Sequence, residues 1–587
     1  MDSLRYFLSV AEIGEFVSSI PERTPYLRYN KIVLGMVLVI WLVFNARKML
    51  FSGTVFLILS CTCTLANPCG LNVRSFGAKG DGKTLDTEAI NQAIEAASAS
   101  GGGTVYFPAG VYLSHSIHLK DHIRLFLDRG ATLKAAVPDG DSGYDLPEPN
   151  NSSYQDFGHS HWKNSLIWGI GLEDLTIEGG GLIDGTDALS RGLGWKEQDR
   201  SANKAIALKE CRNVTIRDIE MRMSGHFALL MTGVDHLTID NVRVDTNRDA
   251  FDIDCCSDVH ISNCSVNTAN DDAIVLKSSY ALGYLKPTEN VTITDCMVSG
   301  FNPGTFLDGT YGRTWQDVPD RDGPCGRIKF GTESNGGFRN IVISNCIFEH
   351  CRGLALETVD GAVMEDITVS NILMRDIVNA PFYIRLGNRA RGPEGMSHSV
   401  IRRIRISHVI VDGADPRYAS SVFGLQNHPV EDVTFTDILI RSKGGLSLED
   451  VMRQTGSNDF FNRDVQRTRQ HPFDVPEQEK GYPEPSAHGI LPAFGLFINH
   501  AKNMVFDHIV IETEQADYRP SIVLMDVEGI QFRDIRTSRA LEIPFFVLKD
   551  VRGLKVSRFE GLEDFQDEHT DDFTCIPSSC KLPVQQH

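Results

Sequence analysis

One short phrase recurs along the chain, and in it apolar and polar residues alternate before an Asn or Asp. At Asn213–Ile219 the phrase reads NVTIRDI, and at Asn290–Cys296 it reads NVTITDC. Clear copies also start at His236, Asp258, Asn340 and Asp366, and fainter copies start at Asp174, Arg403, Asp432, Asn503, Gly529 and Gly553. This alternation predicts strands with one apolar face, and the Asn or Asp predicts the turn that ends each strand.

The spacing of the copies predicts how these strands are connected. Clear copies start at positions 213, 236 and 258, a repeat of 22 to 23 residues that is typical of one coil of a solenoid. One coil cannot bury its own apolar face, so successive coils must stack. We therefore expect an all-β fold, a single-stranded right-handed parallel β-helix, because a β-sandwich would not repeat one phrase in one register.

Segments without the phrase predict the end and the loops of this β-helix. The segment Thr87–Ala99 reads as an amphipathic helix that Asp86 can cap, and we expect it to cover the open end of the coils. Its predicted apolar face consists of Ile90, Ala93, Ile94 and Ala97. Insertions near residues 136–164, 299–325 and 444–488 interrupt the repeat and are predicted to be surface loops.

The N-terminus predicts export. Residues 1–66 read as an N-terminal extension plus a signal peptide or membrane anchor, and residues 67–587 as the β-helix domain. The apolar run Ile32–Phe44 is shorter than the roughly 20 residues that span a bilayer. A basic pair before the apolar stretch Met49–Leu59 and a small residue at Ala66 are typical of a secretory signal peptide. We expect a periplasmic, cell-surface or secreted protein, with membrane attachment through the N-terminus, or a lipid at Cys61, as alternatives.

Charge and cysteine usage narrow the function classes. The formal net charge of −20 argues against a nucleic-acid partner. Three of the 13 cysteines, Cys264, Cys296 and Cys346, occupy the same place in the phrase, so we expect them to stack as buried apolar residues. Cys575 and Cys580 could close a small disulfide loop. The cysteine spacing gives no reason to predict a zinc site, and no metal or cofactor is expected.

Two acidic clusters lie one coil apart. The first is Asn247–Asp254, NRDAFDID, and the second is Asn270–Ile274, NDDAI. Asp249 and Asp272 are 23 residues apart, so stacked coils place them on neighbouring rungs about 5 Å apart. Like charges this close raise at least one pKa, which gives the acid and the carboxylate that glycosidic hydrolysis needs. The alternatives are residues that only end turns, and a calcium site.

With these motifs the chain resembles glycoside hydrolase family 28, the polygalacturonases and rhamnogalacturonan hydrolases, which have a pectin-lyase-like β-helix. The resemblance runs from about Asn72 to near residue 540 and includes FGAKGDG at Phe76–Gly82. Family members read Asn-Thr-Asp-Gly and then Asp-Asp, which stand here as Asn247–Ala250 and Asp271–Asp272. The resemblance implies an inverting hydrolase in which Asp272 is the general acid, while Asp249 and Asp271 activate the water.

Two departures from the family pattern bear on the substrate. The family's Gly-His-Gly corresponds to Gly323–Gly331, GPCGRIKFG, which has no His, and its Arg-Ile-Lys is replaced by Ala355–Glu357. The usual subsite for a second galacturonate is therefore not reproduced. This disfavours an endo-acting homogalacturonan hydrolase and favours an exo-acting enzyme or one acting on rhamnogalacturonan.

Several side chains are expected to bind substrate. Arg327 and Lys329 alternate outward on the strand after the acids, and either could bind a uronate carboxylate. Alternatively, Lys329 simply pairs with Glu357 on the next rung. Further residues expected to face the groove are Asn247, Lys277, Glu333, Glu357 and Arg385. Aromatic residues of the first two insertions could stack on sugar rings or pack on the coils.

We therefore expect a glycoside hydrolase that cleaves a galacturonate-containing pectic polysaccharide or oligosaccharide, exo-acting and inverting. Its expected partner is an acidic, plant-type glycan. Two other functions fit the same fold. A polysaccharide lyase would need an Arg or Lys base and usually calcium, and a non-catalytic carbohydrate-binding β-helix would need no catalytic acid.

Overall fold

The computed structural model describes residues 70–149, 154–155, 159–190, 200–314, 323–454 and 469–580. The chain divides into two units, residues 1–66 and residues 67–587, and all of the described residues belong to the second. The predicted extension, signal peptide and membrane anchor lie outside the described residues. No helix in the described ranges has both the length and the apolar character needed to cross a membrane.

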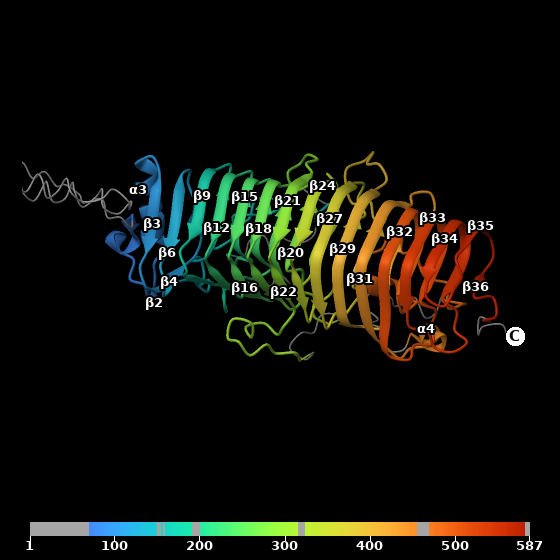
Figure 1. Ribbon diagram of the computed structural model, residues 1–587. Coiled ribbons are helices and arrows are strands. Elements are labelled where there is room, and N and C mark those ends of the chain that lie inside the picture. The colour runs from blue at the N-terminus through green and yellow to red at the C-terminus, as the bar shows by residue number, and fades with distance from the viewer. Residues whose placement is uncertain are drawn as a thin grey trace, which may run out of the picture. The chain divides into compact units, whose positions relative to one another are not determined.

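Residues 67–587 fold as the predicted parallel β-helix, with three strand stacks running along the direction in which the coils pile up (Figure 1). The first stack contains β1 (Leu71–Asn72), β3 (Gly103–Phe107), β6 (Ile123–Leu127), β9 (Glu173–Glu178), β12 (Arg212–Arg217), β15 (Asp235–Asp240), β18 (Ser257–Ser262), β21 (Thr288–Thr294) and β24 (Phe338–Ser344). The second contains β2 (Asp81–Leu85), β4 (Gly110–Ser114), β7 (Ala131–Ala135), β10 (Leu182–Asp184), β13 (Glu220–Arg222), β16 (Arg243–Thr246), β19 (Ser265–Thr268), β22 (Met297–Ser299) and β25 (Ile347–Glu349). The third contains β5 (Ile117–His118), β8 (Ile167–Ile170), β11 (Lys204–Lys209), β14 (Phe227–Thr232), β17 (Asp249–Asp254), β20 (Ile274–Ser278), β23 (Ile328–Ser334), β26 (Leu354–Thr358), β28 (Phe382–Leu386) and β30 (Ser420–Phe423).

Toward the C-terminus, single long strands bridge neighbouring stacks. β27 pairs with both β24 and β25, so one strand carries the first and second stacks. The long strands are β27 (Val363–Arg375), β29 (Val400–Ala414), β31 (Val430–Gly444), β32 (Leu496–Gln515), β33 (Ile522–Thr537) and β34 (Phe546–Phe559). The last coil ends at β35 (Phe565–Thr570) and β36 (Thr574–Ile576), which run antiparallel to β34.

The recurring phrase sets the register of the first stack. Val214 pairs with Leu237, Leu237 with Val259, and Val259 with Val291, so equivalent positions lie on successive rungs. Asn213 and Asp218, like the Asn or Asp at many equivalent positions, adopt left-handed backbone conformations. Asn and Asp tolerate that conformation better than other residues with a side chain, which explains why they recur where each coil bends.

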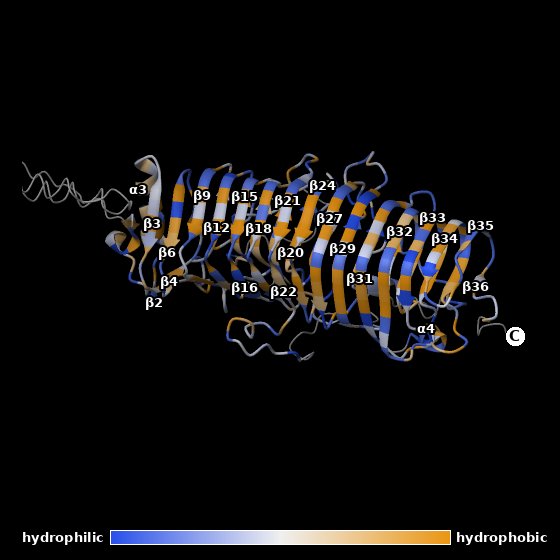
Figure 2. Ribbon diagram, in the orientation of Figure 1, coloured by the Kyte–Doolittle hydropathy of each residue, from blue (hydrophilic) through white to orange (hydrophobic). Residues whose placement is uncertain are grey.

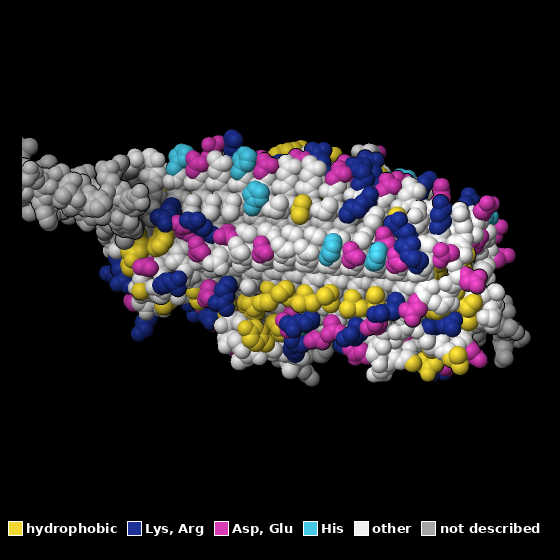
Figure 3. Space-filling model, in the orientation of Figure 1, with side chains coloured by type: hydrophobic (Ala, Val, Ile, Leu, Met, Phe, Trp, Pro, Cys, Tyr) yellow, Lys and Arg dark blue, Asp and Glu magenta, His cyan; other side chains and the backbone are white. Residues whose placement is uncertain are grey.

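The alternation along each strand buries one face. The inward positions of β12, Val214 and Ile216, are 1% and 0% exposed, and they join one continuous apolar core that runs through the coils. Figure 2 shows the result as alternating hydrophobic and hydrophilic bands along neighbouring strands. On the outer face, rows of like side chains follow the stacking direction (Figure 3). Cys264, Cys296 and Cys346 are buried free thiols, as predicted.

The predicted end helix is confirmed as α3 (Thr87–Ala99), which buries the four expected apolar residues against the first coils. The predicted side-chain cap is wrong, because Asp86 makes no capping bond. Its carboxylate instead accepts hydrogen bonds from the backbone N–H of Lys79 at 2.7 Å and of Gly80 at 3.0 Å. The predicted Cys575–Cys580 disulfide is also wrong, because the two cysteines are not bonded to each other. A short helix, η2 (Val73–Phe76), precedes β2.

The insertions differ in what they contact. In the second, Phe301 and Phe306 are 3% and 4% exposed, so they pack on the coils. Asp245 anchors this loop by accepting backbone hydrogen bonds from Gly304 and Phe306, each at 2.9 Å. The third insertion contains α4 (Leu448–Arg453) and η3 (Pro485–His488). It returns to the outer face of the third stack, where Glu484 contacts Arg327 and Tyr482 lies beside Lys329.

Candidate active site

Two of the predicted catalytic aspartates meet where the chain enters the third stack. Asp249 begins β17, and Asp272 lies just before β20 on the next rung. The backbone N–H of Asp272 lies 3.3 Å from Oδ1 of Asp249, and both residues are only 3% exposed. The repeat therefore brings these carboxyl groups together at one corner of the coil, as the 23-residue spacing predicts.

The two carboxyl groups have opposite electrostatic surroundings. Burial raises the pKa of Asp249 well above its usual value, and the charge of Asp271 raises it further. Burial also acts to raise the pKa of Asp272, but Lys329 and Arg327 outweigh it and hold that pKa well below its usual value. The pKa values of the two neighbouring carboxyl groups are thus shifted in opposite directions, so Asp249 holds its proton to a higher pH than Asp272 does.

Asp271 lies at the edge of this pair. Its side chain is 23% exposed and forms an ion pair with Arg248 at 2.5 Å. Asp271 Oδ1 also lies 3.2 Å from the backbone N–H of Asp272. Asn247 donates nothing to the aspartates in the bonds described; its amide oxygen accepts a hydrogen bond from Asn270 on the next rung.

Arg327, just before β23, and Lys329, within it, point outward as predicted, but carboxylates already surround them. Arg327 Nε donates to Asp272 Oδ1 at 2.8 Å, and its Nη2 donates to Glu484 at 2.9 Å. Lys329 Nζ lies 3.4 Å from Asp272 and 3.6 Å from Glu357. The predicted Lys329–Glu357 pair is therefore present. Burial raises the pKa of Glu357 to about 7, although Lys329 and Arg327 oppose the shift.

A second charged cluster lies behind Asp249. Lys277 Nζ is 3.0 Å from Asp252, 3.5 Å from Glu333 and 3.9 Å from Asp249. The first insertion supplies His159, whose Nε2 is 3.1 Å from Asp252 and contacts the Lys277 ammonium. Burial and Lys277 lower the pKa of His159, but Glu333 and Asp252 outweigh them and raise it to about 9.

Arg385 lies on the rung after Glu357, in register with it on β28. It is 1% exposed, and its Nη2 donates to the carbonyl of Gln478 at 3.1 Å. Its Nη1 has no hydrogen-bond partner among the described residues. A buried guanidinium donor without a partner is costly, so Arg385 has an unused donor for a ligand carboxylate.

Sequence reasoning missed the contribution of the third insertion. Glu484, from that loop, accepts from Arg327 and lies 3.3 Å from Nη1 of Arg352. Tyr482 lies beside Lys329, whose Nζ is 5.4 Å from the ring centroid, and its side chain is 37% exposed. The loop carries no copy of the repeat, so the sequence held no register with which to place it.

Three side-chain groups among the described residues of this site have the spacing of a metal site: His159 with Asp249 and Asp252, His226 with Asp249 and Asp271, and Asp271 with Asp272 and Cys325. The first encloses the Lys277 ammonium, 3.0 Å from Asp252. That cation already neutralises the carboxylates that calcium would need as ligands. The group of His159, Asp249 and Asp252 therefore does not fit the calcium alternative.

Comparisons with known proteins agree with this fold. A family model described as "Rhamnogalacturonase A/epimerase, pectate lyase-like" matches residues 70–226, and one described as "Right handed beta helix region" matches residues 196–314. A probable polygalacturonase of Vitis vinifera is 26% identical over 57% of this chain and 70% of its own length.

Other relatives match more narrowly or share only the fold. The plasmin and fibronectin-binding protein A of Streptococcus pneumoniae is 33% identical over 30% of this chain and 24% of its own length. The solved family 28 exopolygalacturonase of Yersinia enterocolitica superimposes with a TM-score of 0.51 at 15% identity. That match covers 83% of this chain and 78% of the other. The chain therefore folds as a right-handed β-helix, and in sequence it is similar to polygalacturonases.

Proposed function

We propose that this protein is a glycoside hydrolase that cleaves galacturonate-containing pectic chains, with Asp249 as proton donor and Asp272 as base. One observation carries the proposal: neighbouring carboxyl groups have pKa values shifted in opposite directions. Hydrolysis of a glycosidic bond needs a protonated carboxyl group for the leaving oxygen and an ionised one for the water.

These roles differ from those that the family resemblance implies, in which Asp272 is the acid. The reason is electrostatic. Asp272 lies between Arg327 and Lys329, which favour its ionised form, whereas Asp249 is buried beside other carboxylates. Asp271, with Arg248 at the edge of the pair, would then help to orient the water or the substrate. Inversion at the anomeric carbon comes from the family resemblance and is part of the proposal.

Exo-action is proposed because loops cover the aspartates. The third insertion places Glu484 and Tyr482 over Arg327 and Lys329, and the first insertion places His159 beside Asp249. An endo-acting enzyme needs an open groove that a chain can enter along its length. Loops that close the site favour a substrate that enters by its end.

Recognition of a uronate is proposed to fall mainly to Arg385. Arg327 and Lys329 are engaged by Asp272, Glu484 and Glu357, whereas Arg385 has an unfilled donor. Arginine can hold a carboxylate in a bidentate, planar geometry, and a galacturonate carboxylate would fill the free Nη1.

Incubation with defined oligosaccharides of homogalacturonan and of rhamnogalacturonan, read by mass spectrometry, tests this function. We expect monosaccharide to be released from one end and no absorbance at the unsaturated-uronate wavelength. Strong absorbance would mean a lyase. Loss of activity in Asp249→Asn and Asp272→Asn is expected, and full activity in both would refute the residue assignment.

A non-catalytic carbohydrate-binding β-helix is the second candidate, because one relative, the pneumococcal plasmin and fibronectin-binding protein A, is named for binding rather than for hydrolysis. It predicts that no oligosaccharide in the panel is cut and that Asp272→Asn leaves glycan binding unchanged.

For the hydrolase, proton NMR of the first product tests the proposed inversion, because an inverting enzyme releases the anomer opposite to that of the substrate.

A further inference from the structure

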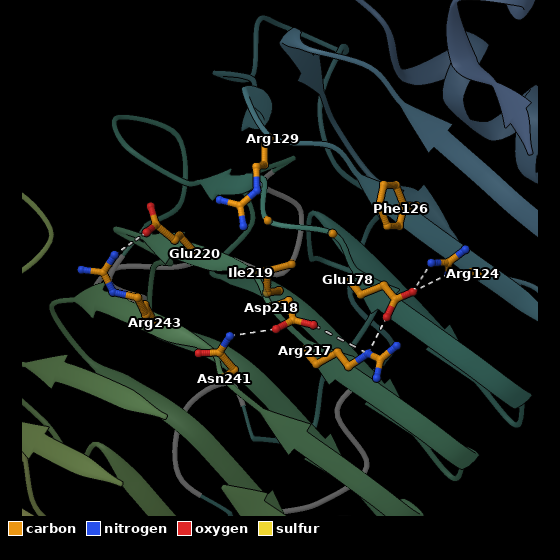
Figure 4. Close-up of a pocket in the computed structure, with 12 residues that line it drawn as sticks. Arg124, Phe126, Arg129, Glu178, Arg217, Asp218, Ile219, Glu220, Asn241 and Arg243 are labelled. Atoms are coloured by element: carbon orange, nitrogen blue, oxygen red, sulfur yellow. Dashed lines mark hydrogen bonds and ion pairs between the residues drawn. The ribbon is translucent and has the colours of Figure 1, made fainter. Parts of the chain in front are cut away.

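A hollow of about 530 Å³ lies at the corner where the first stack turns into the second, away from the aspartates (Figure 4). The aspartates lie at a different corner, where the second stack turns into the third. The hollow is lined by residues of β6, β9, β12, β13 and β16 and by the turns after β6, β9, β12 and β15. It thus spans four successive coils, or about 14 Å along the stacking direction.

The charge of the hollow contrasts with that of the chain. It is lined by four arginines and three carboxylates, whereas the chain as a whole carries −20. The lining charged residues are Arg124, Arg129, Arg217, Arg243, Glu178, Asp218 and Glu220. A local excess of cations on an acidic protein concentrates anions at that place and repels them elsewhere.

The carboxylates of the hollow are already engaged. Glu178 is shared by two guanidinium groups, those of Arg124 and Arg217, the latter at 2.5 Å. Glu220 accepts from Arg243 at 2.6 Å. Asp218 accepts from the side-chain amide of Asn241 at 2.8 Å. These contacts hold the guanidinium groups in place, and a bound anion would find them already oriented.

Among the four arginines of the hollow, Arg129 takes part in none of these pairs. Figure 4 shows its guanidinium between Glu220 on one side and Phe126 and Glu178 on the other. Its guanidinium makes no hydrogen bond or ion pair with the part of the chain that is described. Arginine offers five donors in a planar fork that matches a carboxylate, so Arg129 has its full donor set available.

Two features shape the hollow for a ring-shaped ligand. Gly180, with φ +88°, lies under Arg129, and a Cβ added there would stand 3.3 Å from Cγ of that arginine. The glycine therefore leaves room for the arginine to cross the hollow. Phe126 is half-buried and pairs in register with Glu178, and the Arg124 guanidinium lies over its ring, 4.7 Å from the ring centroid. An apolar ring face next to guanidinium donors matches a sugar ring that carries a carboxylate.

We propose that this hollow is a second, non-catalytic binding site for a short run of uronate residues in an acidic glycan. The choice of glycan rests on the proposed function, but the site does not depend on hydrolysis. Such a site would keep a polymeric substrate on the protein between cleavage events. A glycan held at one site is present at a high effective concentration near the other.

Protection of Arg129 from phenylglyoxal, a reagent for accessible arginines, tests the proposal. The full chain carrying Asp272→Asn would be treated with and without trigalacturonate, and modification of each arginine read by peptide mass spectrometry. Arg552, exposed on β34, is the internal reference. We expect trigalacturonate to protect Arg129 but not Arg552. Neutral galactotriose and inorganic phosphate, at equal concentration, should leave Arg129 reactive.

The variant Phe126→Ala should raise the concentration of trigalacturonate that half-protects Arg129 by about two- to tenfold, the usual effect of one aromatic contact. Thermal unfolding of each protein checks that the fold is retained. Unprotected Arg129, or equal protection by phosphate or galactotriose, would overturn the proposal. Protection of Arg129 without any oligosaccharide cleavage by the unmutated protein would sustain the second site and defeat the hydrolase. Oligosaccharide cleavage without protection of Arg129 would sustain the hydrolase and defeat the second site.

Discussion

Replacing Lys329 with Met removes a cation that keeps Asp272 ionised. Lys329 Nζ lies 3.4 Å from Asp272 Oδ2. At that distance a unit charge contributes about 1 kcal/mol at the dielectric constant of water and about 5 kcal/mol at an effective value of 20. Each 1.36 kcal/mol corresponds to roughly one pKa unit. The pKa of Asp272 should therefore rise by about one to four units, even though Arg327 remains at 2.8 Å.

The assay is the pH dependence of kcat/KM on an oligogalacturonate, since this profile reports the ionisations of the free enzyme. A base must be ionised to act, so the acid limb should move to higher pH by at least about one unit. Lys329→Arg keeps the charge and should keep the limb near its original position. Lys502→Met removes an exposed lysine that pairs with Glu528 at 3.2 Å, and it should leave the profile unchanged.

Two results would refute the reasoning. An unchanged acid limb in Lys329→Met would mean that this lysine does not control the ionisation of Asp272. A shift of the basic limb instead would mean that Asp272 acts as the proton donor, which is the role that the family resemblance implies. Urea unfolding of each variant would show whether any loss of rate comes from loss of fold.

Further predictions concern the buried charges around the site. Glu484→Ala leaves Arg327 with one carboxylate fewer in a buried position, and we expect a loss of about 3 to 5 kcal/mol in the free energy of unfolding, read by urea titration. The exposed counterpart Glu528→Ala should cost less than about 1 kcal/mol, and equal costs would contradict the structural role of Glu484. Glu357 binds a proton more tightly when folded, with a pKa of about 7, so stability should fall as pH rises from its usual pKa toward 7. Glu357→Gln should remove this part of the pH dependence, about 3 kcal/mol, which thermal unfolding at pH 5 and pH 8 would measure. An unchanged difference in stability between the two pH values would contradict the prediction.

Residues that belong to the repeat could be placed from the sequence alone. The period fixes the register, so Asp249 and Asp272 had to lie on neighbouring rungs. Alternation within a strand likewise placed Arg327 and Lys329 on the outside and Lys329 near Glu357. In each case the repeat period shows on which rung, and on which face of the strand, a residue lies.

Residues outside the repeat could not be placed in this way. His159 reaches Lys277 across 118 positions of the chain, and Glu484 reaches Arg327 across 157. Both lie in insertions whose paths depend on tertiary contacts rather than on a local pattern. The same limit explains Asp86, which has the residue type and place of a helix cap. Its carboxylate instead accepts hydrogen bonds from the backbone N–H groups of the preceding turn.

The central claim is that Asp249 donates the proton and Asp272 accepts one, and the substrate's leaving group tests it most directly. The measurement compares kcat/KM of Asp249→Asn and Asp272→Asn on digalacturonate and on a nitrophenyl galacturonide, whose leaving group departs without protonation. General acid catalysis contributes about 10²- to 10⁴-fold. We predict that Asp249→Asn loses most of this factor in kcat/KM on digalacturonate but little of it on the nitrophenyl substrate. Asp272→Asn should lose kcat/KM on both substrates. Recovery by Asp272→Asn alone would contradict the account.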